Sequence, residues 1–433
     1  MKILYVTNLY PPYNVGGYEL ICGTVNRAMQ ARGHETRVLT SDYGVTERGL
    51  PTGEQGVERT LRLHGFFGNP WLGIGKLRAL EVHNNNALRR ALAEFQPDVV
   101  HVFNLGGISK SLAHTLRLAN VPTVYFVSDH WIAQSIVADV WLGWWNRPAT
   151  SLAQRAIRGG LELCGVRSWL DAQAPTAPVR ALEFRRIYFC SEFLREQAVA
   201  RGYGVGHGAV IHNAVDTRRF TPGPTPRGQK CDRLLFVGRL TPEKGIRTVL
   251  NALARIRGPF TGSLTVCGRG EPAFEDELRS LVAKLSLPVK FIEAAAAEMP
   301  MIYREHDALV FASEWEEPFA LTPLEAMACG LPVIATTTGG SVELFRDGVN
   351  ALTFRAGDDA DLGRQILALH HEPELRSRIS AAGCAQVRAE FREELVMDRV
   401  EQYVTESVAT WSGQNVAHRD AAQQTKAEAL AYA

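Results

Sequence analysis

The sequence predicts an α/β protein of two doubly wound domains, each with a parallel sheet covered by helices on both faces. Apolar runs rich in Val, Ile and Leu alternate with helical patterns along most of the 433 residues, which is typical of parallel sheets. Two sets of such runs flank residues 221–232, whose three prolines and two glycines have the composition of a linker. We therefore place the domain boundary at residues 216–221.

The predicted strands fall into two groups along the chain. The first domain, residues 1–216, has predicted strands at 2–8, 35–41, 98–104 and 122–128. The second domain, residues 217–389, has predicted strands at 232–238, 262–268, 289–293, 307–313 and 331–337. Residues 390–433 are expected to form a last helix, up to Trp411, and a polar tail.

Bulk composition argues against several classes of partner. The 47 basic and 46 acidic residues leave a formal charge of +1, so no overall field draws the chain to nucleic acid or lipid. The seven cysteines are scattered without a CxxC pair, which predicts neither a disulfide framework nor a metal site. No apolar run approaches the ~18 residues of a membrane span, and the N-terminus lacks a signal-peptide pattern. We expect a cytoplasmic protein that requires no metal or other cofactor.

Residues 131–186 break the alternation of strands and helices. This segment holds five of the eight Trp, and residues 147–186 hold seven Arg against three acidic residues. One interpretation is a helical insertion whose Trp pack against its own domain. The other is a lid or membrane-surface patch, where Trp lie at headgroup level and Arg meet anionic lipid.

The loops after the strands are the first candidates for a site, because open parallel sheets bind ligands outside the carboxyl ends of their strands. After the first strand, Gly16 and Gly17 open a helix, where backbone amides can approach a phosphate, although a Gly pair is also typical of a tight turn. After the first strand of the second domain, Arg239 and Lys244 bracket the turn into a helix. Two cations at such a turn suit a diphosphate.

Two glutamates lie eight positions apart in "EWEEPFALTPLEAMACGLPV". In one continuous helix Glu317 and Glu325 would be ~12 Å apart, too far for the acid and nucleophile of a glycosidase. If Pro318 begins the helix, Glu317 precedes its N-terminus and Glu325 lies two turns inside. The free amides of Phe319, Ala320 and Leu321 would then favour an anion between two carboxylates that bind neutral hydroxyls. A sugar, a diphosphate and a ribose in a row fit this arrangement.

With these motifs, the chain resembles the retaining nucleotide-sugar glycosyltransferases of the family four type, which have the GT-B fold of two Rossmann-like domains facing a central cleft. The stretch "EEPFALTPLEAMACGLPVIATTTGG" is similar to the E-x7-E signature of that family, and "VGRLTPEKG" and "YNVGG" are similar to its two other markers. The resemblance implies that Glu317 contacts the donor sugar, Glu325 the ribose, and Arg239 and Lys244 the diphosphate. It also implies that Gly16 and Gly17 face the same phosphates, and that the last helix crosses back to the first domain.

The chain departs from this family on the acceptor side. In "YFVSDHW", Ser128 stands where many members carry a His, so we assign substrate binding to Asp129 and a substitute catalytic role to His130. His101, inside a predicted strand, is a further candidate for substrate binding, although a lone strand His is more often a packed core residue.

Two further sequence features qualify the resemblance. The family often reads E-G-F-G where this chain has Glu317-Pro318-Phe319-Ala320, so a stiffer loop is expected. The D-x-D within Asp358–Asp361 is expected to be a helix N-cap and not a metal site.

The sequence therefore predicts a retaining hexosyltransferase that moves a sugar from a nucleotide diphosphate sugar, in our interpretation a UDP-sugar, to an acceptor hydroxyl. The expected acceptor is a saccharide or lipid-linked saccharide of cell-surface polysaccharide or glycolipid synthesis, and no nucleic acid partner is expected. The enzyme would work in the cytoplasm or peripherally on the inner face of the membrane. Two alternatives stay open: another GT-B enzyme, such as a nucleotide-sugar epimerase or a phosphorylase, and a non-catalytic subunit that binds sugar nucleotides.

Overall fold

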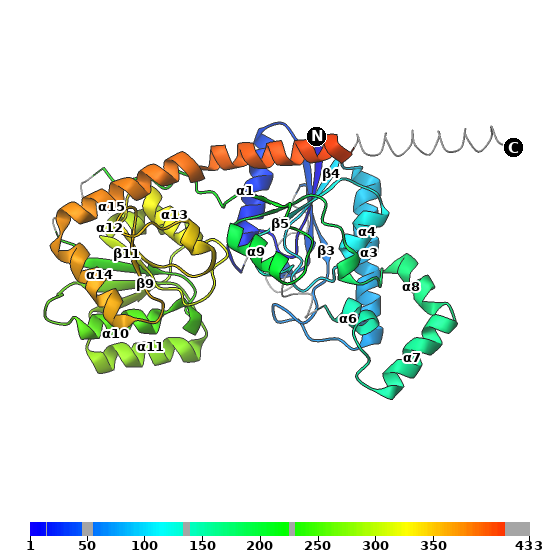
Figure 1. Ribbon diagram of the computed structural model, residues 1–433, viewed down its shortest axis with the longest axis horizontal. Coiled ribbons are helices and arrows are strands. Elements are labelled where there is room, and N and C mark those ends of the chain that lie inside the picture. Colours follow the sequence, from blue (N-terminus) through cyan, green and yellow to red (C-terminus); the bar gives the residue numbers. More distant parts are fainter. Residues whose placement is uncertain (14, 46–54, 133–138, 225–229, 412–433) are drawn as a thin grey trace. The chain divides into compact units, whose positions relative to one another are not determined.

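The computed structural model describes residues 1–13, 15–45, 55–132, 139–224 and 230–411. Its internal contacts divide the chain into two units. The first consists of Met1–Phe189, Arg195–Ile211 and the chain from Met397, and the second of Cys190–Leu194 and His212–Val396. Each unit is built around a parallel sheet of its own (Figure 1). The predicted linker at 221–232 lies partly, and the predicted polar tail wholly, outside the described residues.

The sheet of the first unit has seven strands in the order β3-β2-β1-β4-β5-β6-β7, all paired in parallel. Its centre is buried on both faces because every residue of β4 and all but the first of β1 are shielded from solvent. In the register, Tyr5 of β1 pairs with Val38 of β2 and His101 of β4. The strands are β1 (Lys2–Val6), β2 (Glu35–Ser41), β3 (Val57–Leu61), β4 (Val99–Val102), β5 (Thr123–Val127), β6 (Ile187–Phe189) and β7 (Ala209–Val210).

Helices connect these strands and cover the sheet (Figure 1). The longest, α3, has 22 residues and ends where Gln96 adopts a left-handed conformation with φ 49°. The helices are α1 (Gly17–Ala31), α3 (Ile74–Phe95), α4 (Ser111–Leu118), α6 (Val140–Asn146), α7 (Leu152–Leu163), α8 (Val166–Gln173) and α9 (Glu192–Ala200).

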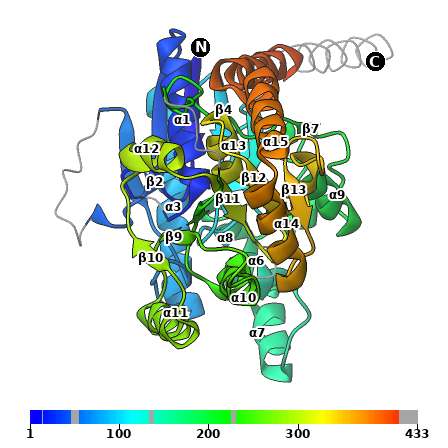
Figure 2. The ribbon, with the colours of Figure 1, turned by 90° about the vertical axis from the view of Figure 1, so that its left-hand side faces the viewer.

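The sheet of the second unit has six parallel strands in the order β10-β9-β8-β11-β12-β13. One apolar core packs helices against it, including Leu234 of β8, Val249 of α10 and Ile366 of α14. Figure 2 shows α13 and α14 beside β12 and β13. The strands are β8 (Arg233–Val237), β9 (Ser263–Cys267), β10 (Val289–Ile292), β11 (Ala308–Phe311), β12 (Val333–Thr336) and β13 (Leu352–Phe354). The helices are α10 (Ile246–Arg255), α11 (Pro272–Leu285), α12 (Met299–Glu305), α13 (Leu321–Ala328), α14 (Asp359–His371) and α15 (Pro373–Gln386).

All nine predicted strands are confirmed, and four more are present. The additional strands lack a strong apolar signal: β3 reads Val-Glu-Arg-Thr-Leu, and β6, β7 and β13 have only three, two and three residues. These strands lie at a sheet edge or next to one, and strands with a weak signal of their own are stabilised by neighbours that are distant in sequence. Short 3₁₀ turns lie at Val179–Ala181, Pro242–Lys244, Ala296–Glu298 and Gly339–Glu343, and a π-helical turn at Val387–Phe391.

The last described helix covers residues 393–411, and from Met397 onward it belongs to the first unit. Its attachment there combines buried apolar side chains, Met397, Val400 and Val404, with polar contacts. Arg32 of α1 forms ion pairs with Asp398 and Glu401 at 2.7 and 2.6 Å, and the Tyr403 hydroxyl donates to the Ile187 carbonyl at 2.8 Å.

The insertion at 131–186 is helical where it is described, in α6, α7 and α8, and residues 133–138 lie outside that part. Trp131, Trp141 and Trp145 are buried, as the packing interpretation predicts, whereas Trp169 is 54% exposed. No helix in the described part of the chain combines the length and apolar character needed to cross a bilayer.

Candidate active site

Strand order locates the candidate sites. In each sheet the chain moves outward in opposite directions from two central strands, β1 and β4 in the first unit and β8 and β11 in the second. The crossover helices separate at such a pair, so a crevice for a ligand opens outside the carboxyl ends of the two strands. The sequence-predicted residues all follow these strands or their neighbours, except His101, which lies within β4.

In the second unit, glycines bring the loops after the strands into close contact. Gly245 follows β8 with φ +72°, and a Cβ there would lie 1.9 Å from the Ala312 carbonyl oxygen after β11. Gly339 follows β12 with φ +58°, and a Cβ there would lie 2.5 Å from the Glu317 carbonyl oxygen. Only residues without a side chain fit at these positions. The loops after β8, β11 and β12 therefore form one surface.

Glu317 is held on this surface by two partners. Its carboxylate accepts a hydrogen bond of 2.6 Å from the Ser313 hydroxyl and forms an ion pair with the Lys244 ammonium. Its side chain is 10% exposed and that of Lys244 is 19% exposed. Lys244 and Glu317 are 73 positions apart in sequence, and their pairing satisfies a carboxylate that is nearly removed from water.

The segment between the two glutamates differs from the prediction. The helix α13 begins at Leu321 and not at Pro318, with Ala320 as an extended N-cap. Pro323 lies in the first turn, where a missing amide costs nothing, so it and not Pro318 marks the start of the helix. The amide of Phe319 is thus outside the helix, and the free amides of the first turn are those of Leu321 and Thr322.

Phe319 fixes the approach to this helix. Its ring is buried and lies 4.7 Å from the His212 ring, centroid to centroid. Its carbonyl accepts a hydrogen bond of 3.0 Å from the Asn213 side chain. Because the ring is used for packing, a ligand could contact Phe319 only through its backbone.

Glu325 is the fifth residue of α13, one turn inside the helix and not two as predicted. It accepts a hydrogen bond of 2.8 Å from the hydroxyl of Tyr303, a fully buried residue of α12. Burial raises the pKa of Glu325 to about 7, although the Tyr303 hydrogen bond and the charge of Arg219 act in the opposite direction.

Arg239 lies at the start of the loop that leads from β8 to Lys244. Its guanidinium is exposed and forms no ion pair with any side chain in the described part of the chain. Burial acts to raise the pKa of Glu243, but hydrogen bonding and, to a smaller extent, the charges of Arg239 and Lys244 lower it overall. The structure thus brings Glu317 and Lys244 together and leaves Arg239 available to a ligand from the same loop.

In the first unit, Gly16 is the N-cap of α1 and Gly17 its first residue. The Gly16 amide donates a hydrogen bond of 2.8 Å to Glu19, whose carboxylate caps the helix. The Glu19 carboxylate thus already accepts the hydrogen bond of the Gly16 amide, which the predicted phosphate contact would also use. The glycine pair remains a prediction for phosphate binding.

Asp129 follows β5 and belongs to a chain of polar groups along the carboxyl ends of three strands. It accepts hydrogen bonds from the Asn104 side chain at 3.1 Å and from the Trp131 amide at 2.8 Å. The Asn104 carbonyl in turn accepts from the Asn8 amide at 2.7 Å. Burial raises the pKa of Asp129 to about 6, against hydrogen bonding by Trp131 and the charges of His130 and Lys110.

The two histidines occupy different environments. His130 is buried, and its Nδ1 lies 2.6 Å from the Gln197 side-chain oxygen. His101 lies inside β4 between the rings of Tyr5 and Phe103, and its Nε2 lies 3.0 Å from the Tyr188 hydroxyl. Burial lowers the pKa of His101 to about 3. The structure places His101 in the core of the sheet, which favours the packing interpretation over a substrate contact.

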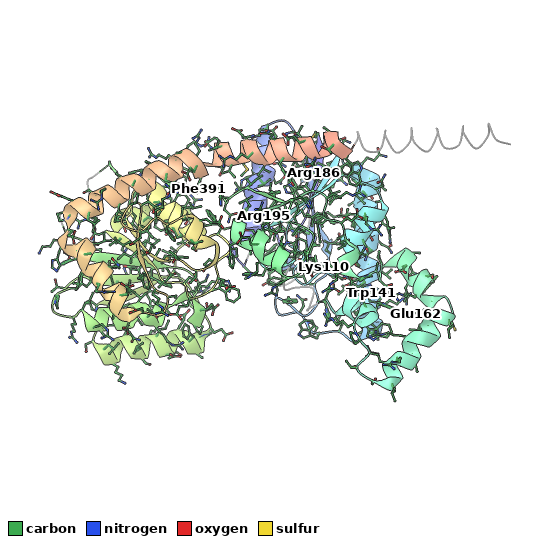
Figure 3. All side chains as sticks on the ribbon, in the orientation of Figure 1. Lys110, Trp141, Glu162, Arg186, Arg195 and Phe391 are labelled. Atoms are coloured by element: carbon green, nitrogen blue, oxygen red, sulfur yellow. The ribbon has the colours of Figure 1, made fainter. Side chains whose placement is uncertain are left out.

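Sequence reasoning missed a cluster of buried charges behind the β4 loop. Lys110 is 3% exposed, and Glu81 and Asp139 are 1% and 5% exposed. Asp139 accepts from the Ser109 hydroxyl at 3.1 Å and the Lys110 amide at 2.8 Å, and Glu81 accepts from Ser111 at 3.0 Å. Burial raises the pKa of Glu81 to about 8. Figure 3 shows Lys110 near Trp141 in this part of the first unit.

The D-x-D motif is a helix cap, as predicted. The Asp358 carboxylate accepts a hydrogen bond of 2.9 Å from the Asp361 amide at the start of α14. Within the described residues, no group of three or more His, Cys, Asp or Glu side chains is arranged to hold a metal ion.

The fold and the site define a glycosyltransferase with the GT-B fold, and comparisons with known proteins identify its family. Residues 15–219 match the family described as Glycosyltransferase Family 4, and residues 219–386 match Glycosyl transferases group 1. An uncharacterized glycosyltransferase of Methanocaldococcus jannaschii is 33% identical over 376 residues, 81% of this chain and 84% of that protein. A glycogen synthase of Mycobacterium tuberculosis is 26% identical over 415 residues, 90% of this chain and 91% of that protein. The chain belongs to the GT4-type glycosyltransferases.

Solved structures agree on the fold. Anabaena HepE in complex with UDP-glucose has a TM-score of 0.66 at 19% identity, over 94% of this chain and 100% of that chain. Sucrose-phosphate synthase of Thermosynechococcus elongatus has a TM-score of 0.69 at 19% identity, over 94% of this chain and 99% of that chain. The predicted GT-B class is confirmed.

Proposed function

We propose that this glycosyltransferase transfers a hexose from a UDP-sugar to an acceptor hydroxyl with retention of the anomeric configuration. The observation that carries the proposal is the ion pair between Lys244 and the buried Glu317, which places a cation and a hydroxyl-binding carboxylate on one surface. The tyrosine-bound Glu325 lies one turn into the adjacent helix. The complex of HepE with UDP-glucose supports a UDP-sugar as the donor.

In this proposal the leaving diphosphate receives most of the stabilisation. The bond between the anomeric carbon and the phosphate oxygen breaks while the acceptor oxygen forms a bond to the same face of the sugar. The acceptor proton passes to a phosphate oxygen of the leaving UDP. Arg239, Lys244 and the first amides of α13 offer positive charge to the phosphates as negative charge develops there. Since Arg239 and Lys244 supply two cations, we expect no metal to be required.

Lys244 would have two functions in the catalytic cycle. In the nucleotide-free chain its ammonium neutralises Glu317. A bound diphosphate would share that ammonium, and the sugar hydroxyls would then donate to the carboxylate. Glu325 would accept from the ribose hydroxyls in place of the Tyr303 hydroxyl. Asp129 and His130 are proposed for the acceptor side, from their position after β5.

For the acceptor we propose a saccharide carried on a lipid, in cell-surface polysaccharide or glycolipid synthesis. The enzyme would then act in the cytoplasm, at the inner face of the membrane. The support for this choice is the arginine-rich insertion, with seven Arg against three acidic residues in 147–186 of an otherwise neutral chain.

The test is a donor screen followed by product analysis. Thermal unfolding with a panel of nucleotides should show stabilisation by UDP, because a ligand at 100 times its Kd adds about 2.7 kcal/mol. The stabilising UDP-sugar should then release UDP in the presence of acceptor and give an α-linked product from an α-linked donor. A changed sugar still attached to UDP would indicate an epimerase, and binding without turnover over all acceptors would indicate a non-catalytic subunit.

A further inference from the structure

The helix α7 in the first unit is amphipathic, but its apolar side does not face the interior of the protein. Its polar residues Gln154, Arg155, Arg158 and Glu162 fall within about 100° of the helix circumference. Leu152, Ile157, Leu161 and Leu163 occupy the remainder. An amphipathic helix of a water-soluble domain normally turns its apolar side inward. No residue of α7 is buried.

Two residues on the polar side of α7, Arg158 and Glu162, contact the protein. Arg158 donates to the Arg147 carbonyl at 2.6 Å, and its guanidinium lies 5.4 Å from the centre of the Trp144 ring. Glu162 pairs with Arg167 of α8 at 2.6 Å, and Arg167 lies 5.5 Å from the Trp145 ring. These contacts hold the helix by its charged side. Figures 1 and 2 show α7 projecting beyond α6 and α3, and Figure 3 shows Glu162 on it, farther from the sheet than Trp141.

The apolar side is therefore exposed to water. Leu152 is 81%, Ile157 56% and Leu163 91% exposed. Burying one side chain of this kind raises a binding constant about tenfold. Burial of all three would therefore strongly favour binding to an apolar phase.

Aromatic side chains extend the exposed apolar surface. Residues 63–75, from the loop after β3 into the first turn of α3, contain no Asp, Glu, Lys or Arg. In this segment Phe66, Trp71 and Ile74 are 37%, 59% and 39% exposed. Trp169 of α8, 54% exposed, packs under Arg78 of α3 with 4.7 Å from the guanidinium to the ring. Of the fifteen exposed large apolar side chains in the described part of the chain, seven belong to α7, α8 and residues 63–75.

The charged side chains around α7 indicate which kind of apolar phase would bind there. Arg147 before α7, Arg155 on the polar side of α7 and Lys76 in the first turn of α3 are exposed. The one acidic residue of α7, Glu162, is neutralised by Arg167. Exposed Leu, Trp at the margin and exposed basic side chains are the composition of a surface for anionic lipid, where long basic side chains reach the headgroups.

We propose that α7, residues 63–75 and Trp169 form a docking surface for an anionic lipid bilayer. Below we call these residues the lipid-facing surface. The inference rests on the proposed function, which includes a lipid-linked acceptor. It deepens that function by locating the surface that would meet the bilayer. Its position relative to the acceptor side follows from shared lining: Phe66 and Trp141 line the same pocket as Gly107 and Ile108 of the loop after β4. A lipid-linked saccharide in the bilayer would thus lie near the loop after β4, whose Asn104 donates a hydrogen bond to Asp129 on the proposed acceptor side.

The test uses the full chain and vesicles of two compositions. In flotation at low salt, vesicles of about 70% phosphatidylcholine and about 30% phosphatidylglycerol should bind the protein. Vesicles of pure phosphatidylcholine should bind at least about tenfold less protein. The double variant Leu152→Glu/Leu163→Glu should lose at least tenfold in binding. Leu118→Glu is the matched control, because Leu118 of α4 is also exposed, at 62%, but lies outside the lipid-facing surface. It should bind as the wild type does.

Several results would overturn the proposal. These are no vesicle binding by the wild type, equal binding by the double variant, or equal loss in the control. A wild-type dimer in sedimentation velocity that the double variant abolishes, without any vesicle binding, would assign the surface to a second copy of the chain. Stabilisation by UDP serves as the separate readout of the donor site. If UDP stabilises the wild type but vesicles do not bind it, the docking surface alone is contradicted. If vesicles bind the wild type but UDP does not stabilise it, the transferase proposal alone is contradicted.

Discussion

The Tyr303 hydroxyl donates a hydrogen bond of 2.8 Å to the Glu325 carboxylate in the interior of the second unit. Burial raises the pKa of Glu325 to about 7 from an ordinary value of 4.5. Between these two values the folded chain keeps a proton that the unfolded chain has lost. The folded state therefore binds more protons in this window, and the contribution of Glu325 to stability falls as the pH rises from about 4.5 to 7.

This linkage gives the first prediction. The variant Glu325→Gln is neutral at every pH, so its free energy of unfolding relative to the wild type should rise by about 1–3 kcal/mol between pH 4 and pH 8. Urea denaturation of both proteins at several pH values measures the difference. A difference that stays constant over this range would mean that Glu325 has an unshifted pKa.

The second prediction contrasts the two cations of the β8 loop. Arg239→Ala and Lys244→Ala should each lower turnover by about 10²–10³-fold, because each removes charge from the leaving diphosphate. Their effects on stability should differ. Arg239 is exposed, so its loss should cost less than about 0.5 kcal/mol. Loss of Lys244 leaves the Glu317 carboxylate, 10% exposed, without its cation and should cost about 1–3 kcal/mol.

Steady-state UDP release and urea denaturation together measure this contrast. Near-normal turnover in both variants would remove the diphosphate assignment. Equal loss of stability in the two variants would mean that the ion pair with Glu317 does not hold that carboxylate in the folded chain.

The third prediction separates the functions of the two glutamates. Glu317→Gln should weaken use of the intact UDP-sugar more than binding of free UDP, because its carboxylate is assigned to sugar hydroxyls. Glu325→Ala should weaken both, because the ribose is common to the two ligands. Calorimetric titration with UDP and with the UDP-sugar gives the two affinities. Equal effects of both variants on free UDP would contradict this division.

The fourth prediction concerns the backbone contact beneath the site. Gly245→Ala places a Cβ 1.9 Å from the Ala312 carbonyl oxygen at φ +72°, so it should destabilise the second unit by more than about 3 kcal/mol. Gly348→Ala is the matched control, since Gly348 has φ +67° with no atom within 4 Å of the added Cβ. It should cost only about 1 kcal/mol. Similar thermal midpoints for the two variants would show that the loops after β8 and β11 can separate.

The central strands could be predicted from sequence because strands buried on both faces have continuous apolar runs, as in Lys2–Val6 and Arg233–Val237. The start of α13 could not, because both Pro318 and Pro323 are compatible with a first turn, and the choice depends on the packing of Phe319 against His212. Residues far from each other in sequence were also inaccessible to pattern reasoning. Examples are the pairing of Lys244 with Glu317 and of Tyr303 with Glu325.

For Asn104, the sequence indicates the position in the site but not the contact that its side chain makes. Asn104 directly follows the apolar run of β4, in the position where a ligand-side residue is expected. Nothing in the sequence indicates that its side chain contacts Asp129, which follows a different strand. The buried cluster of Lys110, Glu81 and Asp139 is harder still, because lone charged residues within helical patterns are ordinarily solvent-exposed.

Cys164 is the C-cap of α7, and this gives the native chain a labelling site beside the lipid-facing surface. Five of the seven cysteine side chains are buried and Cys384 is half-buried, whereas Cys164 is exposed. Because a maleimide reacts with an accessible thiol much faster than with a buried one, a dye should attach first at this position without any substitution. An environment-sensitive dye there would report in real time whether the end of α7 is in water or covered.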